Sequence, residues 1–267
     1  MDGSKLYFFK LLSAASLSTS LDVEDMDLSD TQLIKVSALT RCNLSNSLMP
    51  MNFNTSVVIT DCIGNGMEFI CDETNAPTIH NSSLQNCTFI VKDSSKVFTA
   101  FNNVNLTNSV FQPKSVLTGT GLAAYSLATF GNSNNKSKLQ NCTFNQIGFV
   151  LDGTGVMFDT IFTNSIFNSC YFLIQENGIG VNTSFLSCNF NNTWFQSYTA
   201  GFPYTDYTGS NFNNCNLQYF SQNIIEGCKF INCSNKTAAQ LVANAHQIVG
   251  RSYNFTYNGA TYTVPAA

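Results

Sequence analysis

Leu84-Gln-Asn-Cys87-Thr-Phe89 is the stretch that decides the fold, because the chain repeats it almost letter for letter as Leu139-Gln-Asn-Cys142-Thr-Phe144. Looser copies begin at Leu106, Phe185, Phe212 and Ile225. Each has a large apolar residue, a polar or small pair, a Cys or Ser, one spacer and then Phe or Leu. A unit that returns along a chain in this way is typical of a solenoid, in which every copy stacks on its neighbours.

The large apolar residues of a copy lie five positions apart, as they do from Phe101 to Phe111. A helix has a spacing of three and four, and a flat strand has a spacing of two, so neither explains this period. A period of five fits a chain that runs extended for three residues and then bends. Cys87 and Phe89 then both point inward, and Gln85 and Asn86 make the bend, since Asn tolerates left-handed dihedral angles.

A longer period is superimposed on the short one. Phe89 and Phe111 are 22 residues apart, and Phe144, Phe167 and Phe190 follow one another at intervals of 23. Such an interval predicts one turn of a parallel β-helix, with successive turns about 4.8 Å apart. We expect Phe and Leu to form one inward column, Cys, Ser and Thr to form another, and Asn to line the corners.

This phrasing resembles the pentapeptide-repeat family, a right-handed quadrilateral β-helix in which a central Leu or Phe and the small residue two positions before it point inward. The matching pairs are Cys87/Phe89, Ser109/Phe111, Cys142/Phe144, Ser165/Phe167, Cys170/Phe172, Cys188/Phe190, Thr193/Phe195, Cys215/Leu217 and Cys228/Phe230. Irregular segments interrupt the match, and in this the chain resembles the β-helices of phage tail, fibre and spike proteins. Both resemblances imply an all-β, right-handed parallel β-helix.

The pattern divides the chain into three regions. Residues 1–38 lack the phrase and are predicted to be an N-terminal attachment or cap segment, since an open β-helix end exposes unpaired edges. Residues 39–235 are predicted to form the β-helix, with insertions at 112–138 and 196–210. Residues 236–267 are predicted to be a C-terminal cap, with a short helix from Thr237 to Val249 and a β-hairpin turning at Asn258-Gly259.

Composition limits the classes of partner. Charged residues are only 10% of the chain and the net charge is −4, so the clustered Lys and Arg of a nucleic-acid-binding face are missing. The acidic cluster from Asp22 to Asp30 is interpreted as a solvated linker or a helix start. No stretch approaches the roughly 18 apolar residues of a membrane span. Sequons such as Asn86-Cys-Thr are expected by chance in a chain rich in Asn, Ser and Thr.

The ten cysteines are interpreted as core residues. No Cys-x-x-Cys occurs, and neither His80 nor His246 lies at zinc-finger spacing from cysteines, so we expect no metal site and no cofactor. Most cysteines occupy the small inward position of the repeat, where a free thiol behaves as a small hydrophobe. A reduced internal ladder favours assembly in a reducing cytoplasm. The apolar run at Leu6–Leu12 is interrupted by Lys10 and is not predicted to be a signal peptide.

Aromatic residues crowd the second insertion beside an Asp, and sugars stack on aromatic faces while bonding to polar side chains. We therefore predict a carbohydrate-binding site there, for a host surface glycan. Its residues are Trp194, Tyr198, Phe202, Tyr204, Asp206 and Tyr207. Local loop packing or a subunit interface enriched in Tyr and Trp is the other interpretation of the same cluster.

No catalytic residues are predicted. Cleavage of a glycosidic bond needs two carboxyl groups about 5 to 9.5 Å apart. Asp152 and Glu176 are nearly one turn apart in the sequence, but they are interpreted as isolated surface acids that keep the solenoid soluble.

The resemblance to fibre and spike proteins implies a structural or attachment protein of a virion, such as a phage tail fibre, assembled in the host cytoplasm. It also implies a homotrimer in contact with other virion proteins. Three alternatives stay open: a polysaccharide-degrading spike enzyme, a pentapeptide-repeat protein acting on a DNA enzyme, and a bacterial surface adhesin. The DNA-enzyme alternative calls for an uninterrupted repeat and an acidic stripe, and the sequence lacks both.

Overall fold

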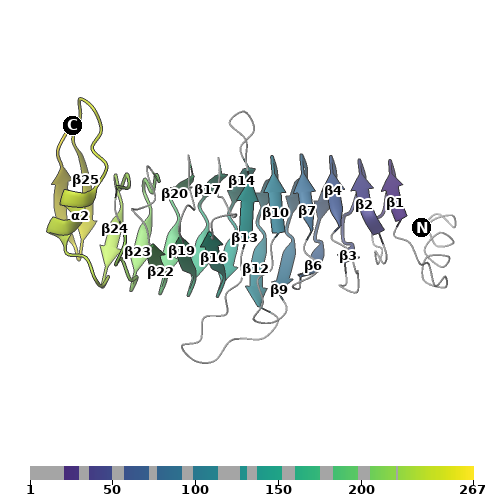
Figure 1. Ribbon diagram of the computed structural model, residues 1–267, viewed down its shortest axis with the longest axis horizontal. Coiled ribbons are helices and arrows are strands. Elements are labelled where there is room, and N and C mark those ends of the chain that lie inside the picture. Colours follow the sequence, from purple (N-terminus) through teal and green to yellow (C-terminus); the bar gives the residue numbers. More distant parts are fainter. Residues whose placement is uncertain are drawn as a thin grey trace.

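The computed structural model describes residues 21–29, 36–49, 57–71, 77–91, 99–113, 127–130, 137–151, 160–174, 183–197, 205–220 and 222–267. In these residues the chain is a parallel β-solenoid with one short helix (Figure 1). The strands lie across the long axis, with β1 at one end and the C-terminal hairpin at the other. The predicted fold class, an all-β parallel solenoid capped by a short helix and a hairpin, is confirmed.

Four sheets run along the solenoid, and we number them as faces in the order in which the chain visits them. Face 1 contains β1 (Leu21–Glu24), β2 (Val36–Thr40), β4 (Val58–Thr60), β7 (Thr78–His80), β10 (Thr99–Asn102) and β13 (Leu127–Phe130). Face 2 contains β5 (Ile63–Asn65), β8 (Ser83–Gln85), β11 (Asn105–Thr107), β14 (Ser137–Gln140), β17 (Thr160–Thr163) and β20 (Ser184–Leu186).

Face 3 is an 11-stranded sheet that runs from near one end of the solenoid to the other. It contains β3 (Leu48–Met49), β6 (Glu68–Cys71), β9 (Thr88–Val91), β12 (Val110–Pro113), β15 (Thr143–Asn145), β18 (Ile166–Asn168), β21 (Asn189–Asn191), β23 (Asn211–Asn213), β24 (Lys229–Ile231), β25 (Tyr253–Tyr257) and β26 (Ala260–Val264). Face 4 contains β16 (Gly148–Leu151), β19 (Tyr171–Ile174) and β22 (Trp194–Ser197).

Most corners are made by a residue in the left-handed conformation, two positions after the central apolar residue. Leu84 is buried, and Asn86 follows it with a φ of 50°. Asn supplies twelve of the nineteen non-glycine residues with positive φ among the described residues, because its short polar side chain tolerates this conformation better than most. The predicted bend at Gln85 and Asn86 is therefore confirmed.

Phenyl rings stack along the axis beneath face 3. Successive rings are 4.4 to 4.9 Å apart between centroids and within 14° of parallel. The column consists of Phe69, Phe89, Phe111, Phe144, Phe167, Phe190, Phe212 and Phe230. Burial of each ring stabilises the fold by about 2 to 3 kcal/mol, so this column is a large part of the core energy. The predicted column of inward Phe is confirmed.

The small inward slot beside this column holds Cys or Ser. Cys142 and Cys188 are fully buried, and their backbone N–H groups donate to the hydroxyls of Ser165 (3.1 Å) and Ser210 (2.9 Å) on the next turn. The thiols in turn donate weakly to backbone carbonyls, as Cys188 does to the carbonyl of Phe162 (3.6 Å). The predicted inward slot for small residues is confirmed.

The stack begins earlier than the sequence predicted. β1 pairs in parallel with β2, and Val23 and Leu28 are buried like the central residues of later turns. The boundary predicted at residue 39 is therefore too late, although residues 1–20 and 30–35 lie outside the described part. The acidic cluster is not a helix start, because Glu24 ends a strand and Asp25 is a left-handed corner.

Both predicted insertions are shorter than expected. β13 lies within 112–138, yet it pairs with β10 on face 1. Residues 205–210 lie within 196–210, yet Asp206 bridges Ser184 on one side and Ile224 on the other. Residues 114–126, 131–136 and 198–204 lie outside the described residues.

The C-terminal cap has a helix and a hairpin. α2 (Ala238–Asn244) begins at a capping box in which the Thr237 side chain accepts from the Gln240 N–H, and its Leu241 is buried. β25 and β26 pair antiparallel around Asn258-Gly259, both of which have positive φ. No helix in the described part is both long and apolar enough to cross a membrane.

Candidate functional site

The residues predicted to bind carbohydrate do not form one cluster. Trp194 is exposed on β22 of face 4, with 46% of its surface accessible. Asp206 and Tyr207 belong to the next turn, on face 2. Tyr198, Phe202 and Tyr204 lie outside the described residues, so that part of the prediction stays a prediction.

Tyr207 belongs to the core and not to a surface site, which corrects the sequence prediction for this residue. Its side chain is fully buried, and its ring stacks on Phe185 with centroids 5.1 Å apart and packs against Phe220 at the same distance. Its hydroxyl finds no hydrogen-bond partner, and burial raises the pKa of the phenol well above its usual value. Tyr207 replaces the Phe or Leu of the repeat, so its aromatic ring was misread as a ligand contact.

Asp206 has a local structural role. Its carboxylate oxygen Oδ1 accepts from the backbone N–H of Thr208 (2.8 Å) and from the Thr208 hydroxyl (2.6 Å). This pattern is the Asx turn expected where a short polar side chain satisfies the backbone at a bend. The carboxylate is therefore engaged in shaping the corner after face 2.

The carboxylates considered for catalysis lie partly outside the described residues, and those described are engaged by neighbouring groups. Asp152 and Glu176 lie outside the described part of the chain. Glu226 forms a bidentate ion pair with Arg251, with both N–O distances 2.7 Å, and this contact lowers the pKa of the Glu226 carboxyl. No cluster of three or more His, Cys, Asp or Glu side chains that could hold a metal ion occurs within the described ranges.

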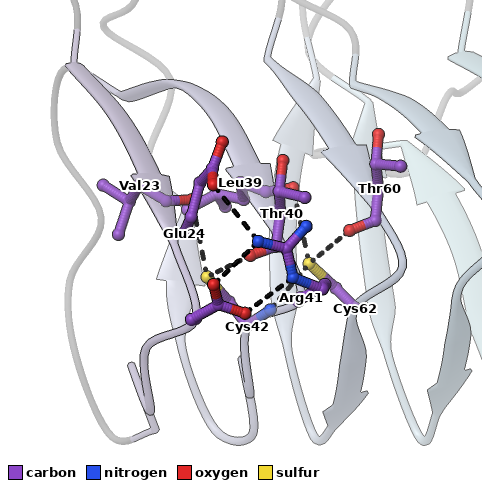
Figure 2. A network of polar contacts seen from close by, with 9 residues as sticks. Val23, Glu24, Leu39, Thr40, Arg41, Cys42, Thr60 and Cys62 are labelled. Atoms are coloured by element: carbon purple, nitrogen blue, oxygen red, sulfur yellow. Dashed lines mark hydrogen bonds and ion pairs between the residues drawn. The ribbon is translucent and has the colours of Figure 1, made fainter.

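Two of the acidic residues at the first turns form ion pairs with one arginine. The guanidinium of Arg41 bonds to Asp25 of the preceding turn (2.6 Å). It also bonds to Glu24 of that turn (3.2 Å; Figure 2). The Arg41 guanidinium holds the pKa of the Asp25 carboxyl below its usual value. The carboxylates of Glu24 and Asp25 thus join neighbouring turns.

Face 4 carries an exposed aromatic and amide surface. Tyr171 and Trp194 pair in register on adjacent strands, with ring centroids 6.3 Å apart and planes inclined by 51°. Asn216 occupies the same position on the following turn. Gln218 lies two positions after Asn216, and its side-chain amide donates to the hydroxyl of Tyr219 (3.1 Å). The side chain of Tyr219 is 37% exposed. We call these five residues the face 4 patch.

The side-chain amide of Asn216 in the face 4 patch is hydrogen-bonded through its oxygen. The Asn216 carbonyl oxygen Oδ1 accepts from the Asn235 side chain (2.8 Å) and from the Gln218 backbone (3.1 Å). Its amide nitrogen makes no hydrogen bond with another described residue. The patch therefore combines fixed aromatic faces with an oriented donor.

The described strands and corners around the patch carry almost no charge. From Phe69 to Ser197, Lys138 is the one charged residue among those that the structure describes. Asn side chains instead form hydrogen-bonded ladders on face 3, where Asn168 donates to Asn145 (2.9 Å), Asn191 to Asn168 (2.9 Å) and Asn213 to Asn191 (3.0 Å). The outer surface therefore consists mainly of amides, hydroxyls and scattered apolar groups.

Comparisons with known proteins find similar solved structures but no relative by sequence. No family model and no curated protein matches the chain. A trypsin-treated variant of QnrB1, a plasmid-mediated fluoroquinolone resistance protein, is 10% identical with a TM-score of 0.36, over 78% of this chain and 90% of that one. HetL, from the cyanobacterium Nostoc sp. strain PCC 7120, is a pentapeptide repeat protein involved in heterocyst differentiation regulation. It is 8% identical with a TM-score of 0.29, over 96% of this chain and 98% of that one. Likeness at this level establishes neither a family nor a function for the chain.

Proposed function

We propose that this chain is a non-catalytic binding protein whose face 4 patch contacts a neutral carbohydrate. The observation that carries the proposal is the exposure of Trp194, held against Tyr171 on a parallel sheet. A large aromatic side chain left 46% exposed beside other aromatic and amide side chains supports a binding role, because Trp and Tyr are enriched among the residues that dominate binding energy.

The chemistry of the patch suits a sugar. The apolar faces of sugar rings pack on Trp and Tyr, and their hydroxyls need oriented donors and acceptors of the kind that Asn and Gln supply. The stacked strands hold Tyr171, Trp194 and Asn216 at the spacing of successive turns, about 4.8 Å, so little side-chain freedom is lost on binding. The described residues of the surrounding faces are nearly uncharged, which favours a neutral ligand over an acidic polysaccharide.

Action on a DNA enzyme is the second candidate, because the chain has the five-residue phrase and the four-faced solenoid of pentapeptide-repeat proteins. The charge distribution is against imitation of DNA, since a mimic must reproduce closely spaced phosphate charges. The described residues from Phe69 to Ser197 contain one Lys and no acid. A virion role and a homotrimer have no support in the structure or in the comparisons and remain predictions from the sequence.

A glycan array followed by calorimetry on the best ligand tests the proposal. Trp194→Ala should weaken binding about tenfold or more, because an aromatic contact of this kind contributes about 1 kcal/mol or more beyond its burial. Ile231→Ala is the matched control, since Ile231 is 45% exposed on face 3, away from the patch. Equal binding by wild type and Trp194→Ala, or no glycan binding together with inhibition of a DNA topoisomerase, would overturn the proposal.

A further inference from the structure

The thiols of the core are arranged in two different ways. In the slot before face 3, thiols and hydroxyls alternate strictly from one turn to the next. The order is Cys87, Ser109, Cys142, Ser165, Cys188, Ser210 and Cys228. Two thiols of this column are thus two turns apart, about 9.6 Å, which exceeds the Cα separation of about 7 Å beyond which no disulfide forms.

Thiols occupy adjacent turns in two other places. The bridge between Asn43 and Ile63 puts Cys42 beside Cys62 near the start of the solenoid (Figure 2). The bridge between Asn216 and Ser234 puts Cys215 beside Cys233 in the last two turns. Adjacent parallel strands are about 4.8 Å apart, which is within the Cα separation of 4.4 to 6.8 Å seen in disulfides.

The two thiols of the last turns point into the same corner. Cys215 donates to the carbonyl of Phe190 (3.3 Å), and Cys233 donates to the carbonyl of Phe212 (3.3 Å). Phe190 and Phe212 are themselves paired on face 3, so the two sulfurs occupy equivalent positions one turn apart. Rotation about the Cα–Cβ bonds is sufficient to bring the sulfurs toward each other.

Solvent accessibility distinguishes the pair Cys215 and Cys233 from the pair Cys42 and Cys62. Cys42 and Cys62 are each 1% exposed and are covered by turns on both sides. Cys233 lies in the final turn and is only partly buried, whereas Cys215 beneath it is fully buried. The contact between the two thiols lowers the pKa of Cys233 and raises that of Cys215, so the accessible Cys233 is the thiol that ionises first.

We infer that Cys215 and Cys233 form a thiol–disulfide exchange site that cross-links the last two turns. The reaction partner is a low-molecular-weight disulfide. The Cys233 thiolate attacks one of its sulfurs, which breaks the S–S bond, releases one small thiolate and leaves a mixed disulfide on Cys233. The Cys215 thiol then loses its proton and displaces the second small thiol, so that two protein thiols are oxidised while one small disulfide is reduced to two thiols.

The cross-link has a structural consequence at the C-terminal end. Cys233 lies in the turn that leads into α2, and the backbone carbonyl of Cys233 also accepts from the hydroxyl of Tyr257 in the hairpin (3.3 Å). Joining Cys233 to the turn below therefore fastens the last turn, against which the cap packs. We expect slower amide exchange in residues 228–235 of the oxidised protein than of the reduced protein.

Peptide mapping of the folded full-length chain tests the inference. The reduced protein is incubated with oxidised glutathione, quenched by alkylation, digested without reductant and analysed by mass spectrometry. The expected product contains Cys215 linked to Cys233, with Cys42 and Cys62 still reduced. Cys233→Ser should abolish the link, and Cys228→Ser, which removes a neighbouring buried thiol from the alternating column, should leave it intact.

Three results would overturn the inference. One is recovery of Cys233 as a free thiol in the folded protein. Another is a stable glutathione adduct on Cys233 with Cys215 still reduced. The third is a link that forms only in denaturant, or as readily between Cys42 and Cys62 as between Cys215 and Cys233. Circular dichroism of each variant establishes that a missing link does not reflect a missing fold.

Discussion

Individual residues of this protein are selected by backbone conformation as much as by burial. At most corners the residue two positions after the central apolar side chain takes a positive φ, near +50° where that residue is not glycine. This conformation costs an ordinary L-residue about 1 to 2 kcal/mol, and Asn and Gly bear it at less cost. The dominance of Asn in the sequence is therefore a property of the corners, where its side chain need not contact any ligand.

Asn164 tests the corner argument, because its φ is 51° and its exposed side chain makes no hydrogen bond within the described residues. Asn164→Ala should lower the free energy of unfolding by about 1 kcal/mol, and Asn164→Gly should leave it nearly unchanged. Urea unfolding monitored by circular dichroism measures both. Equal destabilisation by Ala and Gly would show that the side chain, and not the conformation, matters.

Tyr207 tests the opposite situation, a side chain that fits its slot in shape but not in polarity. Its buried hydroxyl has no partner, so Tyr207→Phe should raise the free energy of unfolding by about 1 kcal/mol. Tyr253→Phe is the matched control and should be destabilising, because the Tyr253 hydroxyl donates to the His246 carbonyl (2.7 Å). A destabilised Tyr207→Phe protein would mean that the hydroxyl is satisfied in solution.

At the scale of one turn, a small side chain in one inward column is compensated by a large side chain in the neighbouring column. Gly64 occupies a position on face 2 where its paired neighbour Leu84 has a large side chain, and Met67 occupies the slot on face 3 that is usually Cys or Ser. A Cβ added at Gly64 would overlap the sulfur of Met67 and lie 3.0 Å from Leu84 Cδ2. The long Met side chain thus fills the space that the missing side chain leaves.

This compensation predicts a strongly non-additive pair of substitutions. Gly64→Leu alone should destabilise by about 1 to 3 kcal/mol through overpacking, and Met67→Cys alone should destabilise by about 2 kcal/mol or more through a cavity. The double variant restores the usual large and small arrangement and should recover most of the loss. A double-mutant cycle from chemical denaturation measures the coupling, and simple additivity of the two losses would contradict the packing argument.

At the scale of the whole molecule, the many buried thiols should make the free energy of unfolding fall as the pH becomes alkaline. Burial raises the pKa of Cys87 and Cys142 to about 11 and that of Cys170 and Cys188 to about 12. An unfolded thiol ionises near pH 8.5, so below that pH both states are protonated and the stability is fully present. As the pH rises further, the unfolded state loses protons first, and stability is lost until the pH passes the folded pKa.

Each such thiol should lower the free energy of unfolding by about 1.4 kcal/mol per pH unit above about pH 9. Cys142→Ser removes one of them and places Ser where the alternating column already accepts it. Its stability should therefore fall less steeply between about pH 9 and pH 10.5 than that of the wild type. Urea midpoints across this range provide the measurement, and identical slopes would contradict the linkage.

The inward columns could be predicted from the sequence because each depends on a pattern within a few residues. The pairs from Cys87/Phe89 to Cys228/Phe230 are all buried as predicted, and the hairpin at Asn258-Gly259 follows from two residues alone. The start of the stack was missed because the first corner is Asp25 and not Asn. Asp25 adopts the same left-handed backbone conformation as the Asn corners, but it does not match the Asn pattern in the sequence.

Only the tertiary structure decided which residues meet across turns. Paired Phe residues are separated by as many as 33 positions, from Phe111 to Phe144, and by as few as 18, from Phe212 to Phe230. Because the loop length changes from turn to turn, the sequence alone does not place Tyr207 inside the core or Cys215 beside Cys233, whereas Trp194 and Tyr171 lie at the regular interval of 23. The local repeat determines which residue types occupy the corners and the inward positions. The register between turns depends on the lengths of the loops that connect one turn to the next, because these lengths decide which residues pair.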